Sequence, residues 1–263
     1  MFRASSLGSR LAAAIGATFL RVILAQVGNV LLVPVFLRGW GSAVYGEWLV
    51  LSAAIGYLTL LDLGMQTYVV NRMCQAYAQG RLDDLHEDLH SSLRVYLVVL
   101  GIGFAVMFVG LTALPLDHIL SLRETTRTAA AVTLMFLGLN TLLISIPVGL
   151  IAGLYRASGA LARGQMIGNG LHLVQLVLTA SLVALELPMM VIAASWLLMN
   201  VGGTGLILWG LRRFRPEIEI GVRRGTLSHG WSLVGPGLLI FVMSIAALLN
   251  VQGTLLVLNG FLS

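Results

Sequence analysis

The segment from Leu11 to Leu37 decides the fold, and it reads LAAAIGATFLRVILAQVGNVLLVPVFL. It carries one charge, Arg21, in an apolar stretch long enough to cross the roughly 30 Å of hydrocarbon in a bilayer as a helix. Apolar stretches of similar length, separated by short segments that contain arginine, follow along the chain. Because lipid offers no partner to free backbone N–H and C=O groups, such stretches fold as bundled helices. The sequence therefore predicts an all-α polytopic membrane helix bundle.

Composition excludes a water-soluble domain. Hydrophobic residues make up 58% of the 263 residues and charged residues only 10%, whereas soluble domains carry about 25% charged residues. The 16 basic residues are all arginine and are spread over short connections, so nucleic acid is not an expected partner. The single Cys74 rules out an internal disulfide and a cysteine-based metal cluster. No cofactor is expected.

Seven membrane-spanning helices are expected, with ends uncertain by several residues. Their predicted ranges are 11–37, 47–71, 95–114, 129–151, 166–185, 190–211 and 231–250. These ranges divide the chain into a six-helix N-terminal lobe (1–211), an arginine-rich cytoplasmic linker (212–230) and the first helix of an incomplete second lobe (231–263). Most arginines fall in alternate connections, and since positively charged loops stay in the cytoplasm, the N-terminus is predicted to be cytoplasmic.

Two further patterns concern the membrane interface. Aromatic residues near the predicted helix ends are expected to anchor the bundle at the headgroups: Trp40, Tyr45 and Trp48 at the outer side, and Tyr155, Trp209 and Trp231 at the inner side. The polar segment 81–94 has leucines at helical spacing, which predicts a short amphipathic helix on the inner membrane surface.

Polar side chains within the apolar stretches are costly and therefore mark candidate functional sites. Arg21 and Asp62 should lie at similar depth in adjacent helices, and we expect them to pair or to share one cavity. The alternative is that Arg21 only extends to the inner headgroups.

The predicted fifth helix carries a polar stripe made of Gln165, Gly168, Asn169, His172 and Gln175. The stripe is either a helix–helix contact or a cavity wall that His172 would make sensitive to pH. The other polar residues expected to line a hydrated interior for a polar substrate are Asn29, Gln66, Asn140 and Asn200.

The segment His86-Glu87-Asp88-Leu89-His90 matches H-E-x-x-H, in which two histidines one helical turn apart bind zinc and the glutamate activates water. It lies in the polar segment among several aspartates and lacks a convincing third ligand. A membrane zinc metalloprotease is therefore an alternative, and a solvated helix face is the preferred interpretation. Other enzyme signatures are missing, so we do not expect an enzyme.

Three short motifs resemble a known family. Residues 37–48 read LRGWGSAVYGEW and residues 57–64 read YLTLLDLG, with Asn71-Arg72 after them. The Tyr45-Gly46 pair, the Asp62-Leu63-Gly64 motif and Arg72 are similar to the opening of polysaccharide flippases, which belong to the superfamily of multidrug and toxin extruders. The segment 153–160, GLYRASGA, and the arginine-rich linker also resemble that family.

The resemblance implies a V-shaped fold of two six-helix lobes around a central cavity, in a bacterial inner membrane. It implies a flippase that moves a lipid diphosphate-linked oligosaccharide across the bilayer by alternating access, for polysaccharide synthesis such as lipopolysaccharide O-antigen. By this analogy Arg21 would attract the headgroup, and Asp62 would tune it or couple an ion. The sequence departs from the family because it holds one lobe and one further helix.

That departure implies partners and leaves alternatives open. Besides membrane lipids and the lipid-linked oligosaccharide, a second subunit or a missing C-terminal lobe is expected to complete the cavity. The alternative functions are a drug or toxin extruder, the metalloprotease, and a scaffold for envelope polysaccharide assembly enzymes.

Overall fold

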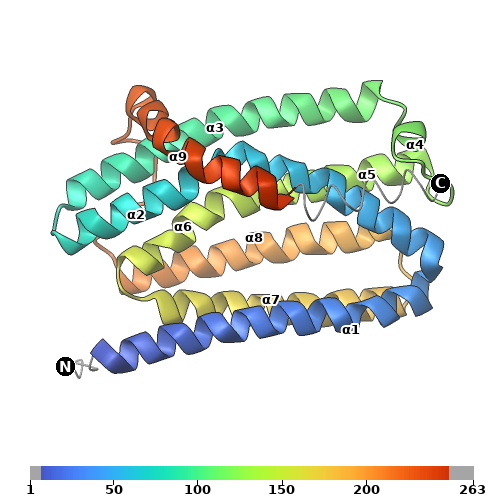
Figure 1. The fold of residues 1–263 in the computed structure, drawn as a ribbon, viewed down its shortest axis with the longest axis horizontal. Helices are drawn as coiled ribbons and strands as arrows, with labels where there is room; N and C mark the ends of the chain where they lie inside the picture. Colours follow the sequence, from blue (N-terminus) through green and yellow to red (C-terminus); the bar gives the residue numbers. More distant parts are fainter. Residues whose placement is uncertain (1–6, 249–263) are drawn as a thin grey trace.

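The computed structural model describes residues 7–248, and these residues form helices and no strand. The elements are α1 (Leu7–Gly56), the 3-10 helix η1 (Tyr57–Asp62), α2 (Met65–Ala78), α3 (Leu82–Ala113), α4 (Leu116–Ile119), α5 (Arg127–Leu139), the π-helix η2 (Asn140–Ser145), α6 (Ile146–Ala157), α7 (Leu161–Ala184), α8 (Met189–Phe214) and α9 (Leu227–Leu248). The long helices lie side by side along one axis (Figure 1). The predicted all-α bundle is confirmed. Residues 249–250 of the predicted seventh helix lie outside the described residues.

Within the part of the chain that the structure describes, five helical stretches are long and apolar enough to cross a membrane, which fits a transmembrane protein. They are Ala12–Asp62, Leu82–Ala113, Arg127–Ala157, Leu161–Ala184 and Met189–Phe214. Apolar side chains such as Phe108 and Val177 are 68% and 61% exposed along them. Water does not tolerate so large an apolar surface, whereas acyl chains do.

The first of these stretches is folded back on itself at Gly41. This residue has φ +75, a left-handed conformation that glycine adopts without steric cost. Figure 1 shows the two arms of α1 joined by this sharp turn at one end of the bundle. Two contacts hold the turn: the Trp40 indole N–H donates to the carbonyl of Leu187 at 3.0 Å, and Tyr45 stacks on Phe36 at 5.0 Å. The turn therefore separates the first two predicted spans.

The outer aromatic residues form a packed cluster, which corrects part of the predicted interface belt. Trp48 is only 4% exposed and lies edge-on to Trp196, 5.4 Å away. Tyr155, predicted at the inner interface, is 1% exposed. These rings stabilise helix packing by burying large apolar faces, whereas Trp209 and Trp231, at 61% and 46% exposed, remain at the surface.

The predicted continuous helix 47–71 is wrong, because it breaks between η1 and α2. Leu63 and Gly64 have φ +54 and +67, so the helical path is interrupted there. The carboxylate of Asp62 accepts from the backbone N–H of Gln66 at 3.3 Å, which satisfies a donor freed at the start of α2. At the break Gly64 packs against the backbone of Gly237 in α9. A non-local contact thus offsets the cost of the break.

The predicted surface helix 81–94 is also wrong. Residues from Leu82 continue without interruption into the membrane span as one helix, α3. His86, Asp88 and His90 are 4%, 2% and 2% exposed, so one face of this polar segment is buried by protein. It is covered by α2, by the segment before α9 and by the start of α9. Asp88 is paired inside the protein with Arg72 and His229, whereas Asp83 and Glu87 on the other face of the helix are exposed.

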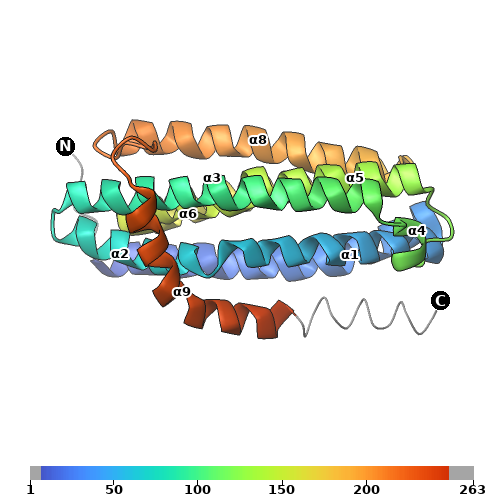
Figure 2. The same ribbon diagram turned by 90° about the horizontal axis from the view of Figure 1, so that it is seen from above.

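The connections alternate between the two ends of the bundle. The α2–α3, α6–α7 and α8–α9 connections lie at the end that also holds the start of α1, and the Gly41 turn, α4 and the α7–α8 connection lie at the opposite end (Figure 1). We call the first the arginine-rich end. Its arginines include Arg81, Arg156, Arg163, Arg212, Arg213, Arg215, Arg223 and Arg224. Figure 2 shows α9 on one outer face of the bundle, where it packs on α2 and α3.

Candidate functional site

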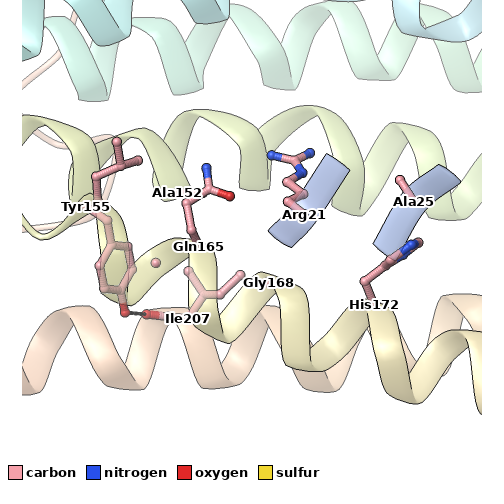
Figure 3. Close-up of a pocket in the computed structure, with 10 residues that line it drawn as sticks. Arg21, Ala25, Ala152, Tyr155, Gln165, Gly168, His172 and Ile207 are labelled. Carbon is pink, nitrogen blue, oxygen red and sulfur yellow. Dashed lines mark hydrogen bonds between the residues drawn. The ribbon is translucent and has the colours of Figure 1, made fainter. Parts of the chain in front are cut away.

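Four predicted polar residues line one open groove between helices of the bundle, which we call the Arg21 groove. It consists of two adjoining hollows of about 360 and 350 Å³ that share Arg21 and Gln165. His172 lines the first hollow and Gln66 the second. The walls come from α1, α2, α6 and α7, with Ile207 of α8 closing one side. Figure 3 shows Arg21 on α1 beside Gln165 and His172 on α7.

Two glycines let the walls of the groove approach one another. A Cβ atom at Gly149 of α6 would collide with the Gln66 side chain, and a Cβ at Gly164 of α7 would lie 2.8 Å from the Tyr155 side chain. Small residues at such positions permit close helix packing in membranes. Tyr155 in turn donates its hydroxyl to the carbonyl of Ile207 at 3.0 Å. The groove is therefore held by contacts among α2, α6, α7 and α8.

The groove carries positive charge without an acidic counterpart. Arg21 is exposed, and among residues 7–248 no ion pair joins it to a carboxylate. Arg156 of α6 lines the second hollow and is likewise exposed. The Nε2 atom of His172 is buried and has no hydrogen-bond partner within the described part of the chain. An unpaired arginine in an apolar span is costly unless it faces water or an anion.

The side chains of the groove are suited to an anionic, hydrogen-bonding group. Arginine offers planar N–H donors that match phosphate geometry, and the Gln66 and Gln165 amides add donors and acceptors. The rest of the lining is apolar or small, for example Ala25, Ala152 and Ile207. The arrangement can hold a charged headgroup next to apolar surface. It contains no nucleophile and base in contact.

Asp62 does not pair with Arg21. Its carboxylate accepts from the Tyr96 hydroxyl of α3 and from the N–H of Gln66, and no ion pair between Asp62 and Arg21 occurs in the part of the chain that is described. The predicted pair is wrong because the break at Leu63 and Gly64 directs Asp62 toward α3. Asp62 also lies outside the lining of the Arg21 groove, although Gln66, one turn later, is part of it.

The remaining predicted residues lie in other helix contacts. Asn200 of α8 donates to the side-chain oxygen of Asn140 at 2.9 Å. Asn169 donates to a backbone carbonyl of α1 at 2.9 Å and is 4% exposed. Gln175 is half-buried on α7, outside the groove lining. The side chain of Asn29 lies outside the described part of the structure. The polar stripe of α7 thus serves both as helix contact and as groove wall.

Tyr155 and Arg156 are among the groove residues that sequence reasoning missed. The predicted helix ended at 151, but α6 continues to Ala157, so both residues extend the helix wall. The signal that could have found them is the segment 154–157, which contains no proline or glycine before Ser158-Gly159, where the helix does end.

The H-E-x-x-H residues hold the segment that leads into α9. His86 Nε2 accepts from the backbone N–H of Glu219 at 3.0 Å, and His90 Nδ1 accepts from the N–H of Arg224 at 3.2 Å. His90 Nε2 lies 2.9 Å from the carbonyl of Glu219, to which it donates. Because both rings accept backbone N–H groups, the contacts need neutral imidazoles. Glu87 is exposed.

This geometry argues against the zinc interpretation. Both nitrogens of His90 and one of His86 are engaged with backbone, and the ring centroids are 5.9 Å apart. Within the described residues no group of three His, Cys, Asp or Glu side chains could hold a metal ion. Two engaged imidazoles and an exposed glutamate indicate a structural contact.

Replacing His90 by alanine tests this structural role. The variant leaves the N–H of Arg224 and the carbonyl of Glu219 without a partner, at a cost of about 1–3 kcal/mol. We expect the melting temperature of the purified protein to fall by several degrees. Glu87→Gln should leave it unchanged, since Glu87 is exposed. The zinc interpretation would be favoured if His90→Ala and Glu87→Gln lowered the melting temperature equally, and if the variants and the unmodified protein melted alike after metal chelation.

Most residues of the family-like motifs make packing contacts. Tyr45 belongs to the aromatic cluster, and Gly46 faces open space. Gly64 forms the break that contacts α9. Arg72 of α2 donates to the buried carboxylate of Asp88 at 2.8 Å, a hydrogen bond that raises the pKa of Arg72. Gly64 and Arg72 therefore lie where α2, α3 and α9 meet, whereas Tyr45 and Gly46 lie near the Gly41 turn.

Comparison of the chain with protein-family models, with curated proteins and with solved structures found no match.

Proposed function

We propose that the protein takes part in moving a lipid diphosphate-linked oligosaccharide across a bacterial inner membrane, as a flippase for cell-surface polysaccharide synthesis. The observation that carries the proposal is Arg21, a cation without a carboxylate partner among the described residues, in a groove whose walls include α1, α6 and α7, parts of stretches that are apolar enough to span a membrane. A diphosphate would supply the missing negative charge.

The groove has the mixed character that such a substrate needs. Gln66 and Gln165 can form hydrogen bonds with phosphate or sugar oxygens. Apolar lining such as Ala25 and Ile207 can accept the first part of a polyprenyl chain. The resemblance of Tyr45-Gly46, Asp62-Leu63-Gly64 and Arg72 to polysaccharide flippases supports the same substrate class.

Orientation and partners are part of this proposal. The concentration of arginine at one end of the bundle supports a cytoplasmic N-terminus. In the proposed assembly a second lobe or subunit would cover the open side of the Arg21 groove, so that the substrate is enclosed during passage. A drug or toxin extruder of the same superfamily is the alternative, and it would bind organic cations that Arg21 repels.

Replacing Arg21 by glutamine is the direct test. Equilibrium binding to the purified protein is measured with a polyprenyl diphosphate and with the uncharged polyprenol of the same chain length. Charge-assisted hydrogen bonds to phosphate contribute about 1.5–3 kcal/mol, so we expect the diphosphate affinity to fall about tenfold or more, with little change for the alcohol.

Arg38→Gln is the matched control. It removes the same charge from an exposed position near the Gly41 turn, at the opposite end of α1's first arm. It should leave both affinities unchanged. Equal binding of the diphosphate and the alcohol to the unmodified protein, or equal effects of Arg21→Gln and Arg38→Gln, would contradict the proposal. Tighter binding of a lipophilic cation to Arg21→Gln alone would favour the extruder.

A further inference from the structure

A second groove lies at the arginine-rich end, between the starts of α1 and α7, which run side by side (Figure 1). It has a volume of about 620 Å³ and shares no lining residue with the Arg21 groove. Its lining is apolar apart from one side chain, Arg163. The apolar lining residues are Ala13, Gly16, Ala17, Leu20, Ala162 and Met166. A groove of this kind offers an elongated apolar surface with a single cation.

Arg163 is held in place by an aromatic ring. Its guanidinium lies 3.6 Å from the centroid of the Phe214 ring at the end of α8, a distance that allows a cation–π interaction. Arg163 is exposed, and no ion pair of Arg163 with a carboxylate occurs between residues 7 and 248. The contact with Phe214 positions the charge while its N–H donors remain free for an anion.

Further exposed arginines and an exposed aromatic ring lie along the end of α8. Arg212 and Arg213 lie in its last turn and are exposed, and in the described structure neither pairs with a carboxylate. The Arg213 guanidinium lies 5.9 Å from the Trp209 ring, which is 61% exposed. Exposed arginines beside exposed aromatic rings at the end of membrane helices suit the headgroup region of a leaflet.

We propose that this groove binds one phospholipid with an anionic headgroup. The phosphate accepts hydrogen bonds from Arg163, and an acyl chain lies along the apolar lining between α1 and α7. Arg212 and Arg213 add positive charge nearby, which favours a net-negative headgroup over a zwitterionic one. Apart from Arg163 the lining is apolar and offers no side-chain partner to a peptide backbone, so it matches an acyl chain rather than a peptide, which would leave backbone groups unpaired.

Two substitutions separate the parts of the proposed site. Arg163→Gln removes the charge beside the headgroup. Gly16→Leu places a side chain into the groove at a position where a Cβ meets no atom within 4 Å, so it fills the groove without straining the helix. Native mass spectrometry of the purified protein measures bound phosphatidylglycerol and, separately, bound phosphatidylcholine.

The unmodified protein is expected to retain phosphatidylglycerol in preference to phosphatidylcholine. Arg163→Gln should lower the phosphatidylglycerol affinity about tenfold, and Gly16→Leu should lower the retention of both lipids. The controls are Arg38→Gln, at the other end of the bundle, and Gly101→Leu, at another open position on α3; both should behave as the unmodified protein.

The proposal is overturned if Arg163→Gln leaves the preference for phosphatidylglycerol intact, or if Gly101→Leu lowers retention as much as Gly16→Leu. An added excess of inorganic phosphate should not displace the lipid, since the acyl chain contributes to binding; displacement would overturn the assignment to a lipid. None of these results depends on Arg21 or on the polyprenyl diphosphate experiment.

Discussion

Replacing Gly64 by alanine is expected to destabilise the protein by about 2–4 kcal/mol, through strain combined with a backbone collision. Gly64 has φ +67, which an alanine adopts at a cost of about 1 kcal/mol. A Cβ at this position would also collide with the carbonyl oxygen of Gly237 and lie 2.8 Å from the backbone N of Phe241. Because backbone atoms cannot rotate away, α9 would have to move.

Thermal unfolding measures the loss of stability, and hydrogen exchange shows whether that loss is concentrated in α9. The melting temperature should fall markedly, and the amides of α9 should lose protection more than those of α5 or α8, because the atoms that a Cβ at Gly64 would meet belong to α9.

Gly80→Ala is a control for the strain alone, since Gly80 has φ +71 and a Cβ there meets no atom within 4 Å. It should cost about 1 kcal/mol. If Gly64→Ala costs no more than Gly80→Ala, the close contact of α9 with the break is wrong.

The limits of sequence reasoning here have a common physical cause. Hydropathy predicted the long helices because each apolar span needs only its own residues to satisfy the backbone in lipid. The break at Gly64 was missed because its stabilising contact comes from Gly237, far along the chain. The polar segment 81–94 was assigned to the membrane surface because its partners, including Glu219 and His229, are equally distant in sequence. A local sequence pattern carries no information about contacts with residues far along the chain.

The residues of the candidate groove could likewise be predicted only in part from the sequence. Arg21, Gln165 and His172 could be predicted because polar residues in apolar helices must face the interior or a cavity. Which of them meet depends on helix rotation and on the exact helix ends. Asp62 therefore faces Tyr96 instead of Arg21, and Tyr155 joins the groove because α6 is longer than predicted.

Asp88→Ala is expected to have the second large effect, because this residue joins three helices. Asp88 of α3 is 2% exposed. Its carboxylate accepts from Arg72 of α2 at 2.8 Å and lies 2.7 Å from the His229 imidazole of α9. Removing one partner of a fully buried ion pair costs about 3–5 kcal/mol. Since the Arg72 and His229 side chains are 40% and 28% exposed, water can solvate them in part, and we expect about 2–3 kcal/mol.

The loss of unfolding free energy, compared across variants, distinguishes a buried contact that joins three helices from an ordinary surface ion pair. Asp88→Asn keeps the volume and one acceptor oxygen, so it should cost less than Asp88→Ala. Asp84→Asn is the matched control on the same helix: Asp84 pairs with Arg81, but the two side chains are 45% and 55% exposed. Exposed pairs contribute at most about 1 kcal/mol, so its melting temperature should barely change. If Asp84→Asn and Asp88→Ala lower the melting temperature equally, Asp88 does not join α2, α3 and α9. If the amides of α9 keep their protection in Asp88→Ala, α9 is held by its apolar contacts alone.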